Sequence, residues 1–227
     1  MNFMTDYAAL SDTLVRRLGL SRPPIAISLL PELPPGATLT PPARFCEMWA
    51  KAMGGETVYA TAKEETCGGG AFYMGLAEAA PGLKTGVLLS RVYPVHRNPM
   101  AAVRTTMIAS PRIPYGTGVA VACAPLGKAS FDADVVLIVC TPAKAMAFAD
   151  AVSYETGGYL SGMTGPATCS VAVAGPYVSG KPTFNVADTG AREYMKLGDD
   201  EMIVSLPGEM LIPVVRNLEE MAQHSSL

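Results

Sequence analysis

The clearest secondary-structure signal in the chain is the run Asp134-Val135-Val136-Leu137-Ile138-Val139-Cys140, followed directly by Thr141-Pro142. This uninterrupted apolar run predicts a central strand that is covered on both faces of a sheet. Thr141 and Pro142 are typical of the N-cap and first position of a helix, which is expected to end at Gly157-Gly158. A buried strand that passes directly into a helix predicts an α/β (or α+β) fold, with a mixed sheet and helices on its faces.

Other segments fit the same architecture. Ile25–Leu30 is predicted to be a second buried strand, and Cys46–Met53 a helix that stops at Gly54-Gly55. A Pro-rich surface connection, residues 31–42, separates these two elements. The remaining expected elements are helices over Met1–Leu20, Ala71–Ala80 and Gly208–Ala222, and strands over Thr57–Ala62, Gly118–Cys123, Val171–Val173 and Met202–Ser205.

The sequence contains an internal echo. In each half a strand is followed by a helix, a Gly-Gly pair, a loop and a cysteine, which is Cys67 in the first half and Cys169 in the second. One interpretation is two pseudo-equivalent halves, about residues 20–115 and 116–222, whose symmetry brings these cysteines together. The alternative is a chance similarity of two α/β units. In both cases the length favours a single compact domain over residues 1–227.

The composition narrows the function classes. Of the 227 residues, 49% are hydrophobic and 16% are charged, and the formal net charge is −3. With 17 Lys and Arg against 20 Asp and Glu, no excess of positive charge is left for a nucleic-acid partner. No run approaches the roughly 20 apolar residues of a membrane span, and the N-terminal segment lacks the apolar core of a signal peptide. We therefore expect a cytoplasmic protein with no membrane partner, and the low charge content suggests a homodimer.

The cysteines are the most informative residues. In the cytoplasm they stay reduced, so the five are interpreted as ligands, nucleophiles or core residues rather than as disulfides. Cys123 and Cys140 lie in apolar segments and are assigned to the core. Cys46, Cys67 and Cys169 lie near a helix start or in turn-rich loops. With no Cys-x-x-Cys pair, their spacing is not diagnostic, and three half-buried small residues are the alternative interpretation.

Three thiolates nevertheless have a chemical use. Thiolate is the soft ligand that iron–sulfur clusters require. Three cysteines would hold a [4Fe–4S] cluster with one iron left open to a ligand, which then acts as a Lewis acid. The cysteines predicted to be these metal ligands are Cys46, Cys67 and Cys169.

Residues beside these cysteines are candidates for ligand binding. Gly68, Gly69 and Gly70 follow Cys67, and their lack of side chains lets backbone amides approach a bulky group or an anion. Arg44 near Cys46, and Arg192 in Asp188-Thr-Gly-Ala-Arg192, are candidates for holding an anion. For Arg192 the alternative is an ion pair with Asp188 that closes the loop.

Two further features are interpreted as structural. The pair Glu64-Glu65 is expected to form a solvated turn, with a proton-transfer group near the site as the alternative. His96, the histidine in the body of the chain, is expected at the surface beside a turn, so a histidine-based zinc site or catalytic triad is not favoured. No catalytic residue is assigned from the sequence.

Several motifs occur together in one known family. In chain order they are Arg44-Phe45-Cys46, Cys67-Gly-Gly-Gly, Ala124-Pro125-Leu126, Asp134-Val135-Val136, Thr141-Pro142-Ala143, Thr156-Gly-Gly-Tyr159, Cys169-Ser170, Pro176-Tyr177 and Asp188-Thr-Gly-Ala-Arg192. The series resembles a prokaryotic family known as domain of unknown function 169, from about Tyr7 to Glu220. The resemblance implies that the family's three characteristic cysteines are Cys46, Cys67 and Cys169, and it implies no activity. Family members often carry Pro-Gly where this chain has Gly68-Gly69.

The leading hypothesis is therefore a [4Fe–4S] protein with three cysteine ligands. Its open iron would bind or transform a small anionic or sulfur-containing molecule, by Lewis-acid, sulfur-transfer or redox chemistry. One alternative is a metal-free protein whose glycine-rich loops and 13 methionines line a pocket for an apolar or haem-like molecule. Another is a thiol enzyme with Cys67 as its nucleophile.

Overall fold

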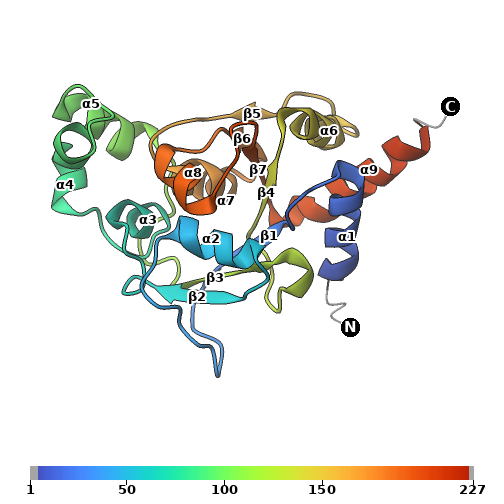
Figure 1. The fold of residues 1–227 in the computed structure, drawn as a ribbon, viewed down its shortest axis with the longest axis horizontal. Coiled ribbons are helices and arrows are strands. Elements are labelled where there is room, and N and C mark those ends of the chain that lie inside the picture. The colour runs from blue at the N-terminus through green and yellow to red at the C-terminus, as the bar shows by residue number, and fades with distance from the viewer. Residues whose placement is uncertain (1–4, 225–227) are drawn as a thin grey trace.

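The molecule is built on one mixed sheet of seven strands (Figure 1). The computed structural model describes residues 5–224. The strand order is β2-β3-β1-β4-β7-β6-β5, and all neighbours are antiparallel except the parallel pair β5 and β6. The strands are β1 (Ile25–Leu30), β2 (Val58–Thr61), β3 (Ala120–Pro125), β4 (Val135–Cys140), β5 (Ser161–Gly162), β6 (Thr183–Asn185) and β7 (Met202–Pro207). The predicted α/β fold with a mixed sheet is confirmed.

The centre of the sheet joins the two halves of the chain. β1 and β4 are neighbours, with Ile27 opposite Val135, and every residue of both strands is buried. The strands on the β1 side precede β4 in the sequence, and those on the β4 side follow β3. The boundary between β1 and β4 is called the seam below. The bounds predicted for both strands are confirmed, because an uninterrupted apolar run fits only the middle of a covered sheet.

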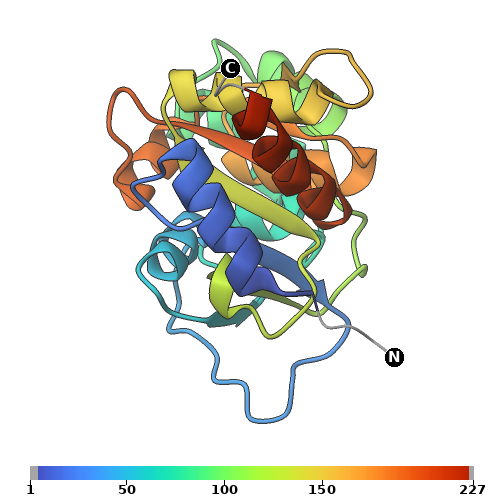
Figure 2. The same ribbon diagram turned by 90° about the vertical axis from the view of Figure 1, so that its right-hand side faces the viewer.

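Helices cover both faces of the sheet (Figures 1 and 2). One core lies beneath α1 (Tyr7–Leu18), α6 (Pro142–Ser153) and α9 (Leu211–His224), and Figure 2 shows α1 and α9 crossing in front of the strands. The core on the opposite face includes residues of α2 (Phe45–Met53), α3 (Gly68–Tyr73), α8 (Thr189–Met195) and a π-helical turn (Cys169–Ala174), which is followed by α7 (Gly175–Ser179). None of the helices within residues 5–224 is both long and apolar enough to span a bilayer.

The internal echo does not correspond to a symmetric arrangement. A two-fold axis that exchanges the antiparallel neighbours β1 and β4 is perpendicular to the sheet. Helices related by such an axis would lie on the same face of the sheet. The helix that follows β1 is α2, and the helix that follows β4 is α6, yet these helices lie on opposite faces. Cys67 follows β2 and Cys169 follows β5, so the chain order of the two halves is similar, but the helices that precede these cysteines cover opposite faces of the sheet.

Other boundaries differ from the expected ones. Val171–Val173, expected to be a strand, lies inside the π-helical turn, where all six residues are buried. When a helical turn is buried on all sides, nearly every position is apolar, and no helical spacing of apolar residues can be recognised. Its sequence then resembles that of a buried strand. The helix expected at Ala71–Ala80 is α3, which begins at Gly68 and ends at Tyr73. The helix expected over Met1–Leu20 is α1, and residues 1–4 lie outside the described part of the chain.

A helical lobe, residues 81–109, stands at one end of the sheet (Figure 1). It contains α4 (Pro81–Lys84), a π-helical turn (Leu88–Val92), α5 (Pro99–Val103) and a second π-helical turn (Arg104–Ala109). No element is predicted from the sequence in this segment, because its pieces are too short to show a helical period. Two 3₁₀ turns, Leu126–Lys128 and Gly208–Met210, follow β3 and β7.

Candidate functional site

Cys46, Cys67 and Cys169 are brought together on one face of the sheet and are called the thiol centre below. Cys46 lies in the first turn of α2, Cys67 is the N-cap of α3, and Cys169 begins the π-helical turn. A hydrogen bond with the Cys46 thiol, burial, and the nearby charges of Cys46, Glu65 and Cys67 raise the pKa of Cys169 well above its usual value. Close thiols of this kind ionise together only when a cation compensates their charge.

The other two cysteines lie in strands, Cys123 in the core on the same face of the sheet as the thiol centre and Cys140 in the core on the opposite face. Cys123 and Cys140 are buried in β3 and β4, and burial raises their pKa values to about 12 and about 11. Both thiols therefore stay neutral at physiological pH, as expected for core residues.

Glu65 fixes the starts of the two helices that carry Cys46 and Cys67. Its Oε2 accepts a hydrogen bond of 2.9 Å from the Phe45 amide, and its Oε1 accepts one of 2.6 Å from the Cys67 amide. The side chain is only 7% exposed, and burial raises the pKa of Glu65 to about 7 against the effect of these two hydrogen bonds. The expected solvated turn is wrong for this residue. Only Glu64 has a turn role, through hydrogen bonds from the amide and hydroxyl of Thr61.

Gly70 leaves the space that Glu65 occupies. A Cβ at position 70 would lie 2.9 Å from Cδ of Glu65 and 3.1 Å from Cδ2 of Phe45. Burial raises the pKa of the Cys67 thiol, while hydrogen bonds from the amides of Gly69 and Gly70 oppose that rise. The amides of Gly69 and Gly70 are therefore directed at the Cys67 sulfur atom.

Replacing Gly70 with alanine is expected to lower the free energy of unfolding by about 1–2 kcal/mol. Overpacking costs up to about 3 kcal/mol, and the higher helix propensity of alanine offsets part of it. Urea unfolding of the metal-free protein measures the change. Gly165→Ala is the matched control, since a Cβ at position 165 meets nothing within 4 Å. Equal stability of the two variants would contradict the assigned role of Gly70.

Asp188 anchors the segment that presents Cys169. Its Oδ2 accepts hydrogen bonds from the amide and the hydroxyl of Thr168, at 2.6 and 2.5 Å, and its own amide donates to that hydroxyl at 2.8 Å. Its Oδ1 accepts from the Ala191 amide at 3.0 Å and so caps α8. One carboxylate thus ties the residue before Cys169 to the start of a helix. On the other side of Cys169, the Ser170 hydroxyl donates to the Pro111 carbonyl at 2.5 Å.

Tyr73 places a buried hydroxyl beside the thiol centre. The side chain is 2% exposed, and its hydroxyl has no hydrogen-bond partner in good geometry within the described chain. Burial raises the pKa of Tyr73 to about 12, as do the charges of Cys169 and Cys67, whereas Ser110 and Arg112 lower it. A buried hydroxyl without a partner is costly unless something accepts its hydrogen bond. No sequence signal separates this tyrosine from an ordinary core residue.

The two candidate arginines have different surroundings. The guanidinium carbon of Arg44 lies 4.3 Å from the centre of the Tyr194 ring, and its charge lowers the pKa of Glu65. Arg44 therefore belongs to the immediate surroundings of the thiol centre.

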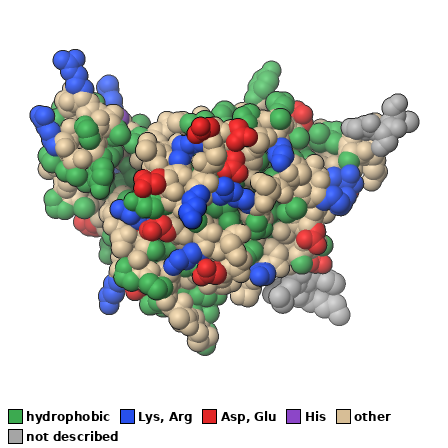
Figure 3. Space-filling model, in the orientation of Figure 1, with side chains coloured by type: hydrophobic (Ala, Val, Ile, Leu, Met, Phe, Trp, Pro, Cys, Tyr) green, Lys and Arg blue, Asp and Glu red, His purple; other side chains and the backbone are tan. Residues whose placement is uncertain are grey.

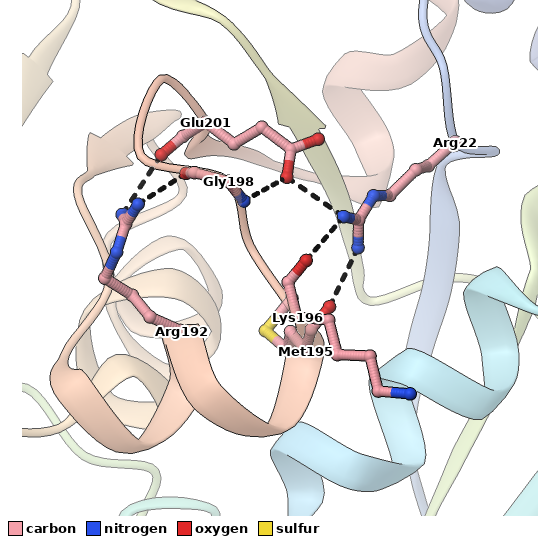
Figure 4. Close-up of polar contacts among 6 residues, drawn as sticks. All are labelled: Arg22, Arg192, Met195, Lys196, Gly198 and Glu201. Atoms are coloured by element: carbon pink, nitrogen blue, oxygen red, sulfur yellow. Dashed lines mark hydrogen bonds and ion pairs between the residues drawn. The ribbon is translucent and has the colours of Figure 1, made fainter.

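Arg192 instead holds the loop that follows α8 (Figure 4). Its guanidinium donates to three backbone carbonyls, those of Val186, Gly198 and Glu201, at 2.8, 2.5 and 3.1 Å. Arg22 supports the same loop from the other side, through the carbonyls of Met195 and Lys196 and the carboxylate of Glu201. Both terminal nitrogens of Arg192 are used in this structural role.

Within residues 5–224, no three His, Cys, Asp or Glu side chains stand in an arrangement that could hold a single metal ion. In the thiol centre, the Cys46 and Cys169 side chains are hydrogen-bonded to each other. A cluster differs from a single ion in that its inorganic core lies between its ligands.

Comparison with known sequences places the chain in a family. The profile of domain of unknown function 169, described as "Uncharacterised ArCR", matches residues 13–217. The chain belongs to this family. An uncharacterized protein of Methanocaldococcus jannaschii is 29% identical over 221 residues, which cover 92% of each chain. No solved structure matches the chain significantly. The thiol centre of this member of domain of unknown function 169 lies entirely within the matched residues.

Proposed function

We propose that this protein binds a [4Fe–4S] cluster through Cys46, Cys67 and Cys169, and that the remaining iron takes a small anionic or sulfur-containing ligand. The observation that carries the proposal is the meeting of three cysteines, distant in sequence, around one buried carboxyl group. When bound, such a cluster supplies an open coordination position for Lewis-acid or redox chemistry. The surrounding residues supply the rest of the site.

The donor set fits the group. Three thiols are the ligands that iron–sulfur clusters prefer. The amides of Gly69 and Gly70 point toward sulfur, and the buried Tyr73 hydroxyl lies beside Cys67 and Cys169 with no hydrogen-bond partner in good geometry among the described residues. Hydrogen bonds to the sulfur atoms of a cluster tune its reduction potential. Hydrogen bonds from these three groups would support a cluster at this site.

Two residues beside the thiol centre would transfer a proton and attract an anionic ligand. Glu65, with a pKa of about 7, holds a proton that it can release near neutral pH, the range in which general acids and bases work best. The Arg44 guanidinium contributes positive charge beside the centre, which favours an anionic ligand. Arg192 is left out of the proposed ligand site because its donors are engaged by three carbonyls.

The two alternatives from the sequence have less support. Burial is the largest influence on Cys67 and raises its pKa, whereas a nucleophilic thiol needs a lowered one. The cleft beside α3 measures about 270 Å³, below the roughly 300–1,000 Å³ of pockets that enclose a drug-sized ligand. This cleft is therefore too small to enclose a haem-like molecule.

The cellular setting belongs to the same proposal. A cluster with an open iron needs a reducing compartment, which agrees with a cytoplasmic location. A homodimer would cover exposed apolar side chains such as Met100 and Ile108, which are 78% and 75% exposed. Light scattering of the purified protein measures the oligomeric state.

Anaerobic purification followed by iron and acid-labile sulfide analysis tests the proposal. We expect about four irons and four sulfides per chain, together with a brown colour from visible absorption. The full-length protein reconstituted with iron and sulfide serves as the second sample, in case the cluster is lost during purification. Iron-free protein with five titratable thiols in both samples would overturn the proposal.

A further inference from the structure

A cleft of about 270 Å³ opens between α3 and the root of the helical lobe. Its lining combines an apolar floor, which includes Phe72, Met107 and Ile113, with the cationic side chains of Lys84 and Arg112. The Arg112 guanidinium carbon lies 5.7 Å from the centre of the Phe72 ring, and its Nη1 donates to the Met107 carbonyl at 2.9 Å. Arg112 is thereby held over the floor while its other guanidinium nitrogens remain able to donate to a ligand.

The charge around the cleft favours anions. Between Ala79 and Phe131 the chain contains no Asp or Glu, and this stretch carries Lys84, Arg91, Arg97, Arg104, Arg112 and Lys128. Figure 3 shows Lys and Arg side chains on the lobe among apolar ones. Glu78 also lines the cleft, but its carboxylate lies 3.3 Å from the Lys84 ammonium group, which compensates its charge. An electropositive surface of this kind raises the local concentration of anionic ligands.

One segment, residues 110–114, contacts both the cleft and the surroundings of the thiol centre. The Pro111 carbonyl accepts the hydrogen bond from Ser170, next to Cys169, and the Ile113 amide donates to the Tyr73 carbonyl at 2.9 Å. Within the same segment, Ser110 and Arg112 both lower the pKa of the Tyr73 hydroxyl. The cleft and the thiol centre therefore share one wall, and Tyr73 lies against it.

We propose that the cleft binds a small carboxylate with an apolar body, and that this molecule is the ligand supplied to the thiol centre. The carboxylate pairs with Arg112, and the apolar body packs on Phe72 and Met107. With a single uncompensated positive charge in the lining, a doubly charged phosphate is disfavoured, and the apolar floor disfavours a bare inorganic anion. Carboxylate binding stands on the cleft alone, whereas delivery to the centre rests on the proposed function.

Calorimetric titration with 3-phenylpropionate tests the cleft. Its uncharged analogue of the same shape, 3-phenylpropanamide, is the control ligand. We expect saturable binding of the acid, weakened roughly tenfold or more in Arg112→Gln, because a hydrogen bond to a charged group is lost. Arg104→Gln removes the same charge from a residue that does not line the cleft, and it should bind like the wild type. Absence of saturable binding, equal binding of the amide, or unchanged affinity in Arg112→Gln would each overturn the proposal.

Two further samples separate this inference from the proposed function. The Cys67→Ser protein should bind 3-phenylpropionate as the wild type does, since the cleft does not use the thiols. In the anaerobic, iron-loaded protein, saturation with the acid should shift the visible and electron paramagnetic resonance spectra, and unchanged spectra would overturn delivery to the centre. If the protein binds the acid but never binds iron, the carboxylate site is supported, and the proposed function and delivery both fail.

Discussion

Replacing Cys46, Cys67 or Cys169 with serine is expected to reduce the iron content from about four atoms per chain to less than about one, and to remove the brown colour. A serine hydroxyl is a hard, weakly acidic ligand and does not replace a soft thiolate. Cys123 and Cys140 are held in the strands β3 and β4, so neither is expected to replace a lost ligand. Iron analysis and visible spectra of anaerobically purified variants measure the effect.

Cys123→Ala and Cys140→Ala are the matched controls for this experiment. Each removes one buried thiol of the same chain, and each should keep the iron content of the wild type. Circular dichroism of all five variants shows whether a loss of iron follows from unfolding instead. Full colour in all three serine variants would refute a cluster held by the thiol centre.

Replacing Asp188 with alanine is expected to lower the free energy of unfolding by about 3–5 kcal/mol. Its carboxylate accepts hydrogen bonds from the amide and hydroxyl of Thr168 and from the amide of Ala191. Thr168 is 1% exposed and Ala191 is fully buried, so water does not readily replace the lost acceptor. Each hydrogen bond to a charged group contributes about 1.5–3 kcal/mol, and the contributions overlap. Chemical unfolding of the metal-free protein gives the value.

Asp6→Ala is the control for the loss of a helix cap alone. Asp6 also caps a helix, through the Ala9 amide at 3.0 Å, but it lies at the surface, so about 0.5–1 kcal/mol is expected. Asp188→Asn should fall between the two, because its amide keeps one acceptor oxygen. If Asp188→Ala is no less stable than Asp6→Ala, Asp188 does not anchor the Cys169 segment as described.

The sequence contained enough information for the central sheet. β1 and β4 are continuous apolar runs, and the Thr141-Pro142 start of α6 is confirmed, because these signals depend only on neighbouring residues. The π-helical turn at Cys169 was mistaken for a strand, since burial on all sides removes the period that distinguishes the two. The helical lobe gave no signal, because its helices span only four or five residues each.

For the candidate site too, the sequence predicts only the features that depend on neighbouring residues. The three cysteines could be selected from local context, because neither a strand nor a disulfide accounted for them. Glu65 and Tyr73 could not be selected, since their roles depend on which segments meet in space. The role of Glu65 follows from its hydrogen bonds with the amides of Phe45 and Cys67, and the role of Tyr73 follows from its position beside Cys169. For Arg192, the sequence shows a charge in a loop but cannot show three carbonyls around it.

The position of the thiol centre across the seam has a consequence for biosynthesis. Cys46 and Cys67 belong to the half of the sheet that leaves the ribosome first, whereas Cys169 follows about 100 residues later, beyond β4. A nascent chain that ends before Cys169 offers only two of the three proposed ligands, so loading of the proposed cluster would have to wait for the second half to fold. Once loaded, the cluster would cross-link the two halves of the chain, in addition to the pairing of β1 with β4 and the packing of α1 on α9 and of α2 on α8.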